Sequence, residues 1–311
     1  MRRVSFVLLC LLTAVSGCIK NEASEIPVVA AIADKNANAD EKKSETPVAI
    51  QDPNQLATDG FGSLSGTVTL DSADGKLPPI VDFTKAMMEK DGKCCLGPKC
   101  KAEEKIDLAW VVDPKTKAVA NVMVWIKPPL GKTFAIHDNY KKRDKETVVI
   151  DQPHCQFLPH VSAFQPYYMA NGKHVETGQK LVIKNSANCS HNVRVLGDQI
   201  VNKGFNNTLP PGTELVSTDL KDPLKAQRLP LEVRCDIHPW MAARLFVFDH
   251  PYYAITKADG TYEIPLVPAG AEISVFAWHE GQGWVLTNKG QAVTVEKGKK
   301  KTLDFQVKYA P

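Results

Sequence analysis

The segment RCDIHPWMAARLFVFD, residues 234–249, places a cysteine, a histidine and a methionine at intervals of three: Cys235, His238 and Met241. With 8 Cys, 8 His and 6 Met in 311 residues, this order and spacing arises by chance at a given position about once in 10⁵. A cysteine thiolate, two imidazoles and a weak axial thioether are the ligands of a mononuclear type 1 (blue) copper site. The segment therefore predicts a copper site that takes one more histidine from elsewhere in the chain.

His191 is the candidate for that second histidine. It begins an alternating, strand-like stretch within KNSANCSHNVRVLG (184–197), well before Cys235 in the chain. Asn185 and Asn192 flank it and could fix the surrounding loops through hydrogen bonds, as residues behind metal ligands commonly do. Two other residues, Cys155 and His160, could instead lie near the metal as additional ligands or form a second site.

The chain from residue 61 onward reads as β-structure. Apolar residues alternate with polar ones in short runs that Gly, Pro and Asn interrupt, and this pattern predicts an all-β fold built from one or two sandwiches. Only IVDFTKAMMEK, near residue 85, hints at a helix. The expected strands are 64–70, 118–126, 146–151, 180–185, 191–197, 231–235, 243–249, 261–266, 271–279, 291–297 and 302–308.

KNSANCSHNV followed by CDIHPWM resembles the cupredoxins over about residues 146–250, and the length of the second loop is closest to that of amicyanin. The resemblance implies a Greek-key sandwich that passes single electrons to a transient redox protein partner. That partner would dock at an apolar rim, Pro239 and Trp240, where the His238 ring edge reaches the surface. The implied ligands of the one copper ion are the imidazoles of His191 and His238, the thiolate of Cys235 and the axial thioether of Met241. PHCQFLPH (153–160) departs from amicyanin and is similar to exported cupredoxin-like proteins described as methylamine-utilisation-like.

A second resemblance covers the flanking parts of the chain. ITKADGTYEIPLVPAGAEISVFAW (255–278) resembles the carboxypeptidase regulatory-like family, a small transthyretin-like sandwich with a carbohydrate-binding-like fold. Asp259-Gly260 supplies its hairpin turn, and GTVTL near residue 66 and NVMVWI near 121 look like its opening strands. We therefore expect residues 61–130 and 251–308 to form one discontinuous domain, with residues 146–250 inserted in it. Two consecutive sandwiches are the alternative.

The stretch FAWHEGQGW has two interpretations. Its polar and aromatic residues could bind a polysaccharide, with the two tryptophans as stacking platforms for sugar rings. Packing and hydrogen bonding at the interface between the domains is the interpretation that we favour. The residues concerned are Trp278, His279, Glu280 and Trp284.

The first residues predict export. Residues 1–17 combine Arg2 and Arg3 with an apolar run that is too short to span a bilayer, as in a signal peptide. The run ends in VSGC, which resembles a bacterial lipobox and implies lipid attachment at Cys18; an ordinary secretory signal is the alternative. Ile19 favours a lipid-anchored protein of the outer membrane, facing the periplasm or the surface. Residues 18–60 contain no aromatic residue after the cysteine and predict a disordered tether.

Apart from Cys10 in the signal peptide and the lipidation candidate Cys18, the chain has six cysteines: Cys94, Cys95, Cys100, Cys155, Cys189 and Cys235. Cysteines of exported proteins tend to pair. If Cys235 binds metal, an odd number is left, so one is free, a ligand or partnered elsewhere. GKCCLGPKC (92–100) could hold a soft-metal site or, as we favour, a local disulfide. Cys155 and Cys189 would most simply pair with each other.

Composition and motifs exclude other classes of function. The formal net charge is only +3, and Lys and Arg do not cluster among aromatic residues, which argues against a nucleic-acid partner. Hydrolase motifs such as G-x-S-x-G and H-E-x-x-H are missing from the sequence. An electron carrier is therefore favoured over an enzyme. The alternative is a cell-envelope binding module that takes carbohydrate or copper without electron transfer.

Overall fold

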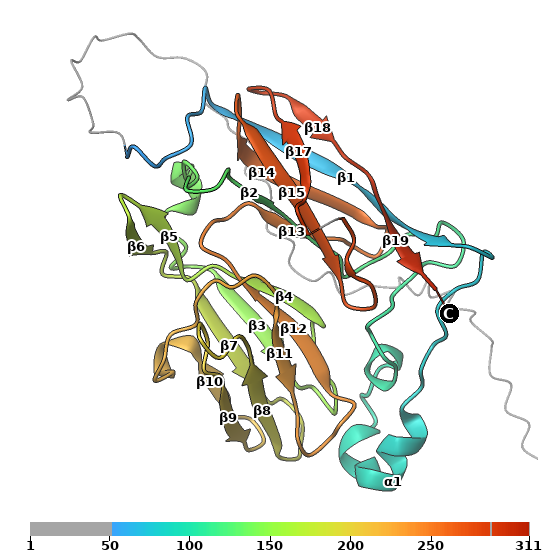
Figure 1. The fold of residues 1–311 in the computed structure, drawn as a ribbon. Helices are drawn as coiled ribbons and strands as arrows, with labels where there is room; N and C mark the ends of the chain where they lie inside the picture. The colour runs from blue at the N-terminus through green and yellow to red at the C-terminus, as the bar shows by residue number, and fades with distance from the viewer. Residues whose placement is uncertain (1–51, 287, 311) are drawn as a thin grey trace, which may run out of the picture. The chain divides into compact units, whose positions relative to one another are not determined.

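The computed structural model describes residues 52–286 and 288–310, and it confirms the predicted all-β class. Within this part of the chain, strands β1 to β19 form several sheets, and α1 (Thr84–Cys95) is the one α-helix (Figure 1). The predicted signal peptide, its Cys18 and most of the predicted tether lie outside the described residues. No helix in the described part is both long enough and apolar enough to cross a membrane.

Two sheets made from both ends of the described chain enclose one core. The first sheet has the order β14-β1-β18, with β19 also paired to β1, and the second has the order β13-β2-β15-β16, with β17 paired to β15. Buried side chains of β1, β2, β14 and β15 meet between the sheets. The strands are β1 (Phe61–Ser72), β2 (Met123–Lys127), β13 (Tyr253–Ile255), β14 (Thr261–Pro268), β15 (Glu272–His279), β16 (Gly283–Trp284), β17 (Gln291–Thr294), β18 (Lys300–Thr302) and β19 (Phe305–Tyr309).

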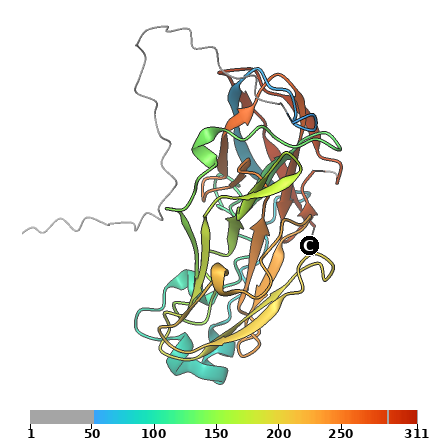
Figure 2. The same cartoon turned by 90° about the vertical axis from the view of Figure 1, so that its left-hand side faces the viewer.

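The middle of the chain forms a second sandwich with its own core (Figures 1 and 2). One sheet has the order β10-β7-β3 and the other the order β4-β12-β11-β8-β9, while β5 and β6 form a separate hairpin. The strands are β3 (Thr147–Asp151), β4 (Val161–Phe164), β5 (Tyr167–Ala170), β6 (Lys173–Glu176), β7 (Lys180–Lys184), β8 (His191–Leu196), β9 (Phe205–Leu209), β10 (Glu214–Val216), β11 (Leu231–Arg234) and β12 (Ala242–Val247).

An aromatic cluster joins the two sandwiches. Strand β12 points Leu245 into its own core but turns the neighbouring Phe246 toward the other sandwich, where Trp125 of β2 lies at a ring-centroid distance of 5.8 Å. Residues of a strand alternate between its faces. Both faces of β2 and β12 are buried. Their segments MVWI and LFVF therefore appear in the sequence as continuous hydrophobic runs without alternation.

Helix α1 packs on the core of the second sandwich, although its residues fall in the segment that the sequence assigns to the first. Met87 is fully buried in that core, and the helix ends in two disulfides, Cys94–Cys189 and Cys95–Cys155. The predicted Cys155–Cys189 pair and the local disulfide in GKCCLGPKC are therefore wrong. Two consecutive cysteines at the helix end each reach a different segment of the sandwich, and Cys100 is left free.

The packed chain also begins earlier than the predicted end of the tether at residue 60. Leu56 is buried among the residues of the first sandwich, and its backbone N–H donates to the carbonyl of Thr133 at 2.8 Å. The Thr58 hydroxyl donates to the carbonyl of Ala269 at 2.9 Å. One buried apolar side chain and a few hydrogen bonds to the backbone thus hold this short segment against the first sandwich. The composition of the segment does not predict this packing.

Candidate metal centre

Strand order brings the predicted ligands to one end of the second sandwich. His191 is the first residue of β8, Cys235 directly follows β11, and these two strands are antiparallel neighbours. The turn from Cys235 to Met241 closes on itself: the N–H of Met241 donates to the His238 carbonyl at 3.0 Å, and the N–H of Cys235 donates to the Met241 carbonyl at 3.3 Å. The three-residue spacing therefore returns the loop to the same edge, from which β12 starts.

Three donor atoms converge there. The Nδ1 atoms of His191 and His238 lie 3.1 Å apart, and the Cys235 sulfur lies 4.0 Å from the first and 3.9 Å from the second. All three side chains are buried. Two ring nitrogens and a thiol thus face a common point inside the protein.

The separations fit a single ion. Metal bonds of about 2.0–2.1 Å to nitrogen and about 2.3 Å to sulfur are long enough for one ion to reach all three donors at these separations. A planar set of two histidines and one cysteine, with a weak axial ligand, is the donor arrangement of blue-copper sites.

The electrostatic environment keeps both imidazoles neutral. Burial, together with the neighbouring His238 ring, lowers the pKa of His191 to about 4. Burial also lowers the pKa of His238. Because a histidine binds metal only through an unprotonated nitrogen, both rings are in the ligating form at neutral pH.

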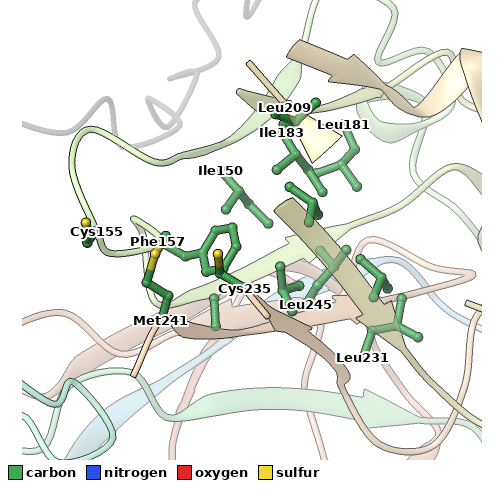
Figure 3. Close-up of a cluster of buried hydrophobic side chains, with 14 of the residues drawn as sticks. Ile150, Cys155, Phe157, Leu181, Ile183, Leu209, Leu231, Cys235, Met241 and Leu245 are labelled. Atoms are coloured by element: carbon green, nitrogen blue, oxygen red, sulfur yellow. The ribbon is translucent and has the colours of Figure 1, made fainter. Parts of the chain in front are cut away.

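Met241 lies at the same end of the core. Its side chain is fully buried in the cluster that contains Cys235, and Figure 3 shows both at one end of this cluster together with Phe157. A buried thioether at this end of the core could supply a weak fourth ligand.

Asn192 joins the two ligand loops. Its side-chain oxygen accepts hydrogen bonds from the N–H groups of Asp236 at 2.7 Å and Ile237 at 3.4 Å, and from the Cys235 thiol at 3.3 Å. Asn185 fixes the other side, since its amide donates to the carbonyls of Cys189 and Leu209, each at 2.8 Å. Both asparagines therefore form hydrogen bonds with the loops that carry the candidate ligands.

Replacing Asn192 with alanine is expected to lower the free energy of unfolding by about 1–3 kcal/mol, because the N–H groups of Asp236 and Ile237 lose their acceptor. Urea unfolding of the metal-free protein measures this. Asn207→Ala is the matched control: Asn207 is an exposed residue of the neighbouring strand β9, so a change below about 0.5 kcal/mol is expected. Equal effects of the two variants would contradict the supporting role of Asn192.

The structure differs from the predicted docking rim. His238 is only 1 % exposed, so its ring edge does not reach the surface. Helix α1 covers it: the Asp91 carboxylate lies 4.0 Å from His238 Nε2, and the Trp240 ring stacks on Phe83 at 6.5 Å. Only Pro239 remains exposed. His238 Nε2 is buried and has no hydrogen-bond partner among the described residues.

The two possible extra ligands lie in different places. Cys155 lies near the centre, with its sulfur within 4.8 Å of a His238 ring nitrogen, but it is bonded to Cys95 and carries no thiolate for a metal. The Nε2 atom of His160 lies 2.5 Å from a Glu280 carboxylate oxygen, on the side of the first sandwich. Neither residue therefore adds a ligand to the three convergent donors in this structure.

FAWHEGQGW lies between the sandwiches. Trp278 is 8 % exposed within the aromatic cluster, and Trp284 packs against the same cluster, so the tryptophans do not form an open stacking platform. His279 is fully buried beside Trp110, and Glu280 pairs with His160 and Arg244. The structure thus places these residues in the interface that we favoured.

The sequence did not single out several residues around the centre. Phe83 belongs to the weak helical pattern and Asp91 follows it, while the His154 backbone forms a hydrogen bond with His191. His154 also takes part in a separate group of donors, with its Nδ1 2.7 Å from the Glu104 carboxylate and with Cys100 nearby. Two consecutive cysteines at a helix end were the one signal that could have placed α1 on the second sandwich.

Comparison with known proteins gives cupredoxins among solved structures. A copper-containing nitrite reductase from Thermus scotoductus is 16% identical with a TM-score of 0.25, covering 33% of this chain and 22% of the reductase chain. A purple cupredoxin from Nitrosopumilus maritimus is 13% identical with a TM-score of 0.23, covering 33% of this chain and 99% of that one. A reduced amicyanin variant is 13% identical, with a TM-score of 0.25, and the match covers 40% of this chain and 99% of the amicyanin chain. No protein-family model and no curated protein matches the chain.

Proposed function

We propose that this protein is an exported copper-binding lipoprotein that transfers single electrons through one mononuclear type 1 (blue) copper site. The proposed ligands are His191, Cys235 and His238, with Met241 in the axial position. The observation that carries the proposal is the convergence of two Nδ1 atoms and one thiol at separations of 3.1, 3.9 and 4.0 Å. Copper bound there would supply the one-electron couple.

The chain's own residues would keep this site rigid. His191 is held in a strand, Cys235 and His238 in a turn closed by backbone hydrogen bonds, and Asn192 links the two. Donors held in one geometry for both oxidation states need little rearrangement, and this suits electron transfer. Burial keeps water away from the donors. It also keeps the His191 imidazole neutral, because it lowers its pKa.

We place the protein in the cell envelope, anchored by lipid at Cys18, with a redox protein as its transient partner. Two disulfides support an oxidising compartment outside the cytoplasm. We also propose that residues 61–130 and 251–308 form one discontinuous carboxypeptidase regulatory-like domain around a cupredoxin domain at 146–250. The pairing of β1 with β14, β18 and β19 supports this division.

One observation favours a second candidate, copper binding without electron transfer. The His238 ring edge, where an exposed imidazole would meet a redox partner, is covered by α1 and is 1 % exposed. A covered site retains its ion well but exchanges electrons slowly. The rate of electron exchange therefore separates the two candidates.

Loading the purified full chain with Cu(II) is expected to give one ion per molecule and an intense visible charge-transfer band of the blue type. Metal analysis and the absorption spectrum measure both. Stopped-flow reduction by a small-molecule reductant then reports electron exchange. A colourless copper complex would rule out the type 1 site, and a blue protein that is reduced only over minutes would favour copper binding alone.

A further inference from the structure

The two disulfides of α1 touch each other. Cys94 is bonded to Cys189 and Cys95 to Cys155, and the Cys94 sulfur lies 3.6 Å from the Cys155 sulfur of the other bridge. Sulfur atoms at that distance are in van der Waals contact, with no side chain between them. Thiol–disulfide exchange proceeds by attack of a thiolate on a disulfide sulfur. If Cys94 is released as a thiolate, the Cys155 sulfur of the other bridge is therefore within its reach.

The four sulfurs differ in their access to solvent. Cys94 is 2 % exposed and Cys95 and Cys155 are fully buried, whereas Cys189 is only partly buried. A reductant from solution therefore meets Cys189 first. Attack there releases Cys94, the cysteine that touches the second bridge.

We propose that Cys94, Cys95, Cys155 and Cys189 form a thiol–disulfide exchange site whose substrate is a dithiol reductant. A thiolate of the dithiol attacks the Cys189 sulfur, forms a mixed disulfide and expels Cys94 as a thiolate. The second thiol of the dithiol then displaces Cys189 and closes the reductant into its own disulfide. Two electrons enter the protein, and the oxidised dithiol leaves.

The second step redistributes these electrons without any further reductant. The Cys94 thiolate attacks the Cys155 sulfur, the Cys94–Cys155 bond forms, and the Cys95–Cys155 bond breaks as Cys95 leaves as a thiolate that takes up a proton. The products are one new bridge and two thiols, Cys95 and Cys189. Helix α1 then remains tied to Cys155 but is released from the loop that carries Cys189.

The exchange site adjoins the two histidines of the metal centre. The Cys189 and Cys94 sulfurs lie 3.6 and 3.9 Å from His191 Nε2. The Cys95 and Cys155 sulfurs lie within 4.8 Å of a ring nitrogen of His238. Since α1 also covers His238, exchange changes the attachment of the segment that closes this centre. The exchange needs no metal, so it can be tested independently of the proposed copper site.

Limited reduction of the metal-free full chain tests the relay. The protein is treated with one equivalent of dithiothreitol under native conditions, quenched in acid with N-ethylmaleimide and mapped by mass spectrometry, with circular dichroism as the check of folding. Besides the free Cys100 and Cys235, the expected product carries the label on Cys95 and Cys189 and contains a Cys94–Cys155 bridge. Label on Cys94 and Cys189 with Cys95–Cys155 intact, or loss of both bridges together, would overturn the proposal.

Two variants approach the same bridge from opposite sides. Cys189→Ser leaves Cys94 as a thiol beside the Cys95–Cys155 bond, and Cys95→Ser leaves Cys155 as a thiol beside the Cys94–Cys189 bond. Each is expected to lose part of its remaining native bridge and to gain Cys94–Cys155, whereas Cys100→Ser keeps both native bridges. Retention of only the native bridge in both variants would refute exchange. If one of the two variants fails to fold, the other variant and the limited reduction of the wild type still show whether exchange occurs.

Discussion

Copper-loaded Cys235→Ser is expected to be colourless where the wild type is blue, because the intense visible band of a type 1 site comes from the bond between thiolate sulfur and Cu(II). The copper affinity is also expected to fall by more than the roughly 10–100-fold that the loss of a supporting residue costs. Serine keeps the size of the side chain, so the fold and the hydrogen bonds of Asn192 to Asp236 and Ile237 remain. The absorption spectrum and a competitive chelator titration measure the two effects.

Cys100→Ser is the matched control, because Cys100 is the other cysteine outside a disulfide among the described residues. It lies beside Glu104 and His154, away from the convergent donors, and its loss is expected to leave the band unchanged. A blue Cys235→Ser protein, or a colourless Cys100→Ser protein, would show that the thiolate ligand had been assigned to the wrong residue.

Acid is expected to destabilise the metal-free protein strongly between about pH 7 and pH 5. Burial lowers the pKa of His250 and of His279 to about 4 in the folded state, against about 6.5 in the unfolded chain. The unfolded chain therefore binds more protons in this interval, and stability is lost as the pH falls below about 6.5. The expected loss is about 2 kcal/mol for each of these two histidines, and His191, whose pKa is also lowered to about 4, adds a similar loss, which makes about 6 kcal/mol in all. Urea unfolding followed by tryptophan fluorescence at several pH values measures it.

His250→Asn tests the origin of this pH dependence. The Nδ1 atom of His250 accepts the N–H of Tyr252 at 3.2 Å, and an asparagine oxygen can take that hydrogen bond without titrating. The variant is expected to lose about a third of the pH dependence, or about 2 kcal/mol over the interval. An unchanged slope would assign the acid sensitivity to groups other than His250.

The sequence predicted the donors of the centre better than their surroundings. Cys235 and His238 share one turn, so their spacing is a local property, and the strand that follows His191 is visible in its alternation. The cover formed by α1 was not predictable in this way. Met87 is its one fully buried apolar residue beyond the cysteines, and the kink at Asp91 interrupts the helical period. The exposure expected for His238 was wrong for this reason.

The disulfides show the same limit. The partners of Cys94 and Cys95 lie 95 and 60 residues away along the chain, so tertiary packing and not spacing decides which sulfurs meet. Strands with buried alternating residues, such as β8 and β11, were predicted. Strand β9 was missed because three of its five residues, Asn206, Asn207 and Thr208, are exposed and polar. Backbone pairing with β8 forms that strand without an apolar pattern.

The position of β1 in its sheet also determines an order of events as the chain is made. Apart from an isolated bridge between Thr69 and Ala118, the strands that pair with β1 begin at residue 261 or later, so most of β1 stays unpaired until these residues have emerged. The strands from β3 to β12 need no such wait, and contacts closer in sequence form sooner. The middle sandwich can therefore be complete, with its donors in place, while its flanking sandwich is still an open chain. A truncation before residue 261 would remove every strand that pairs with β1 and leave β1 as an exposed edge prone to aggregation.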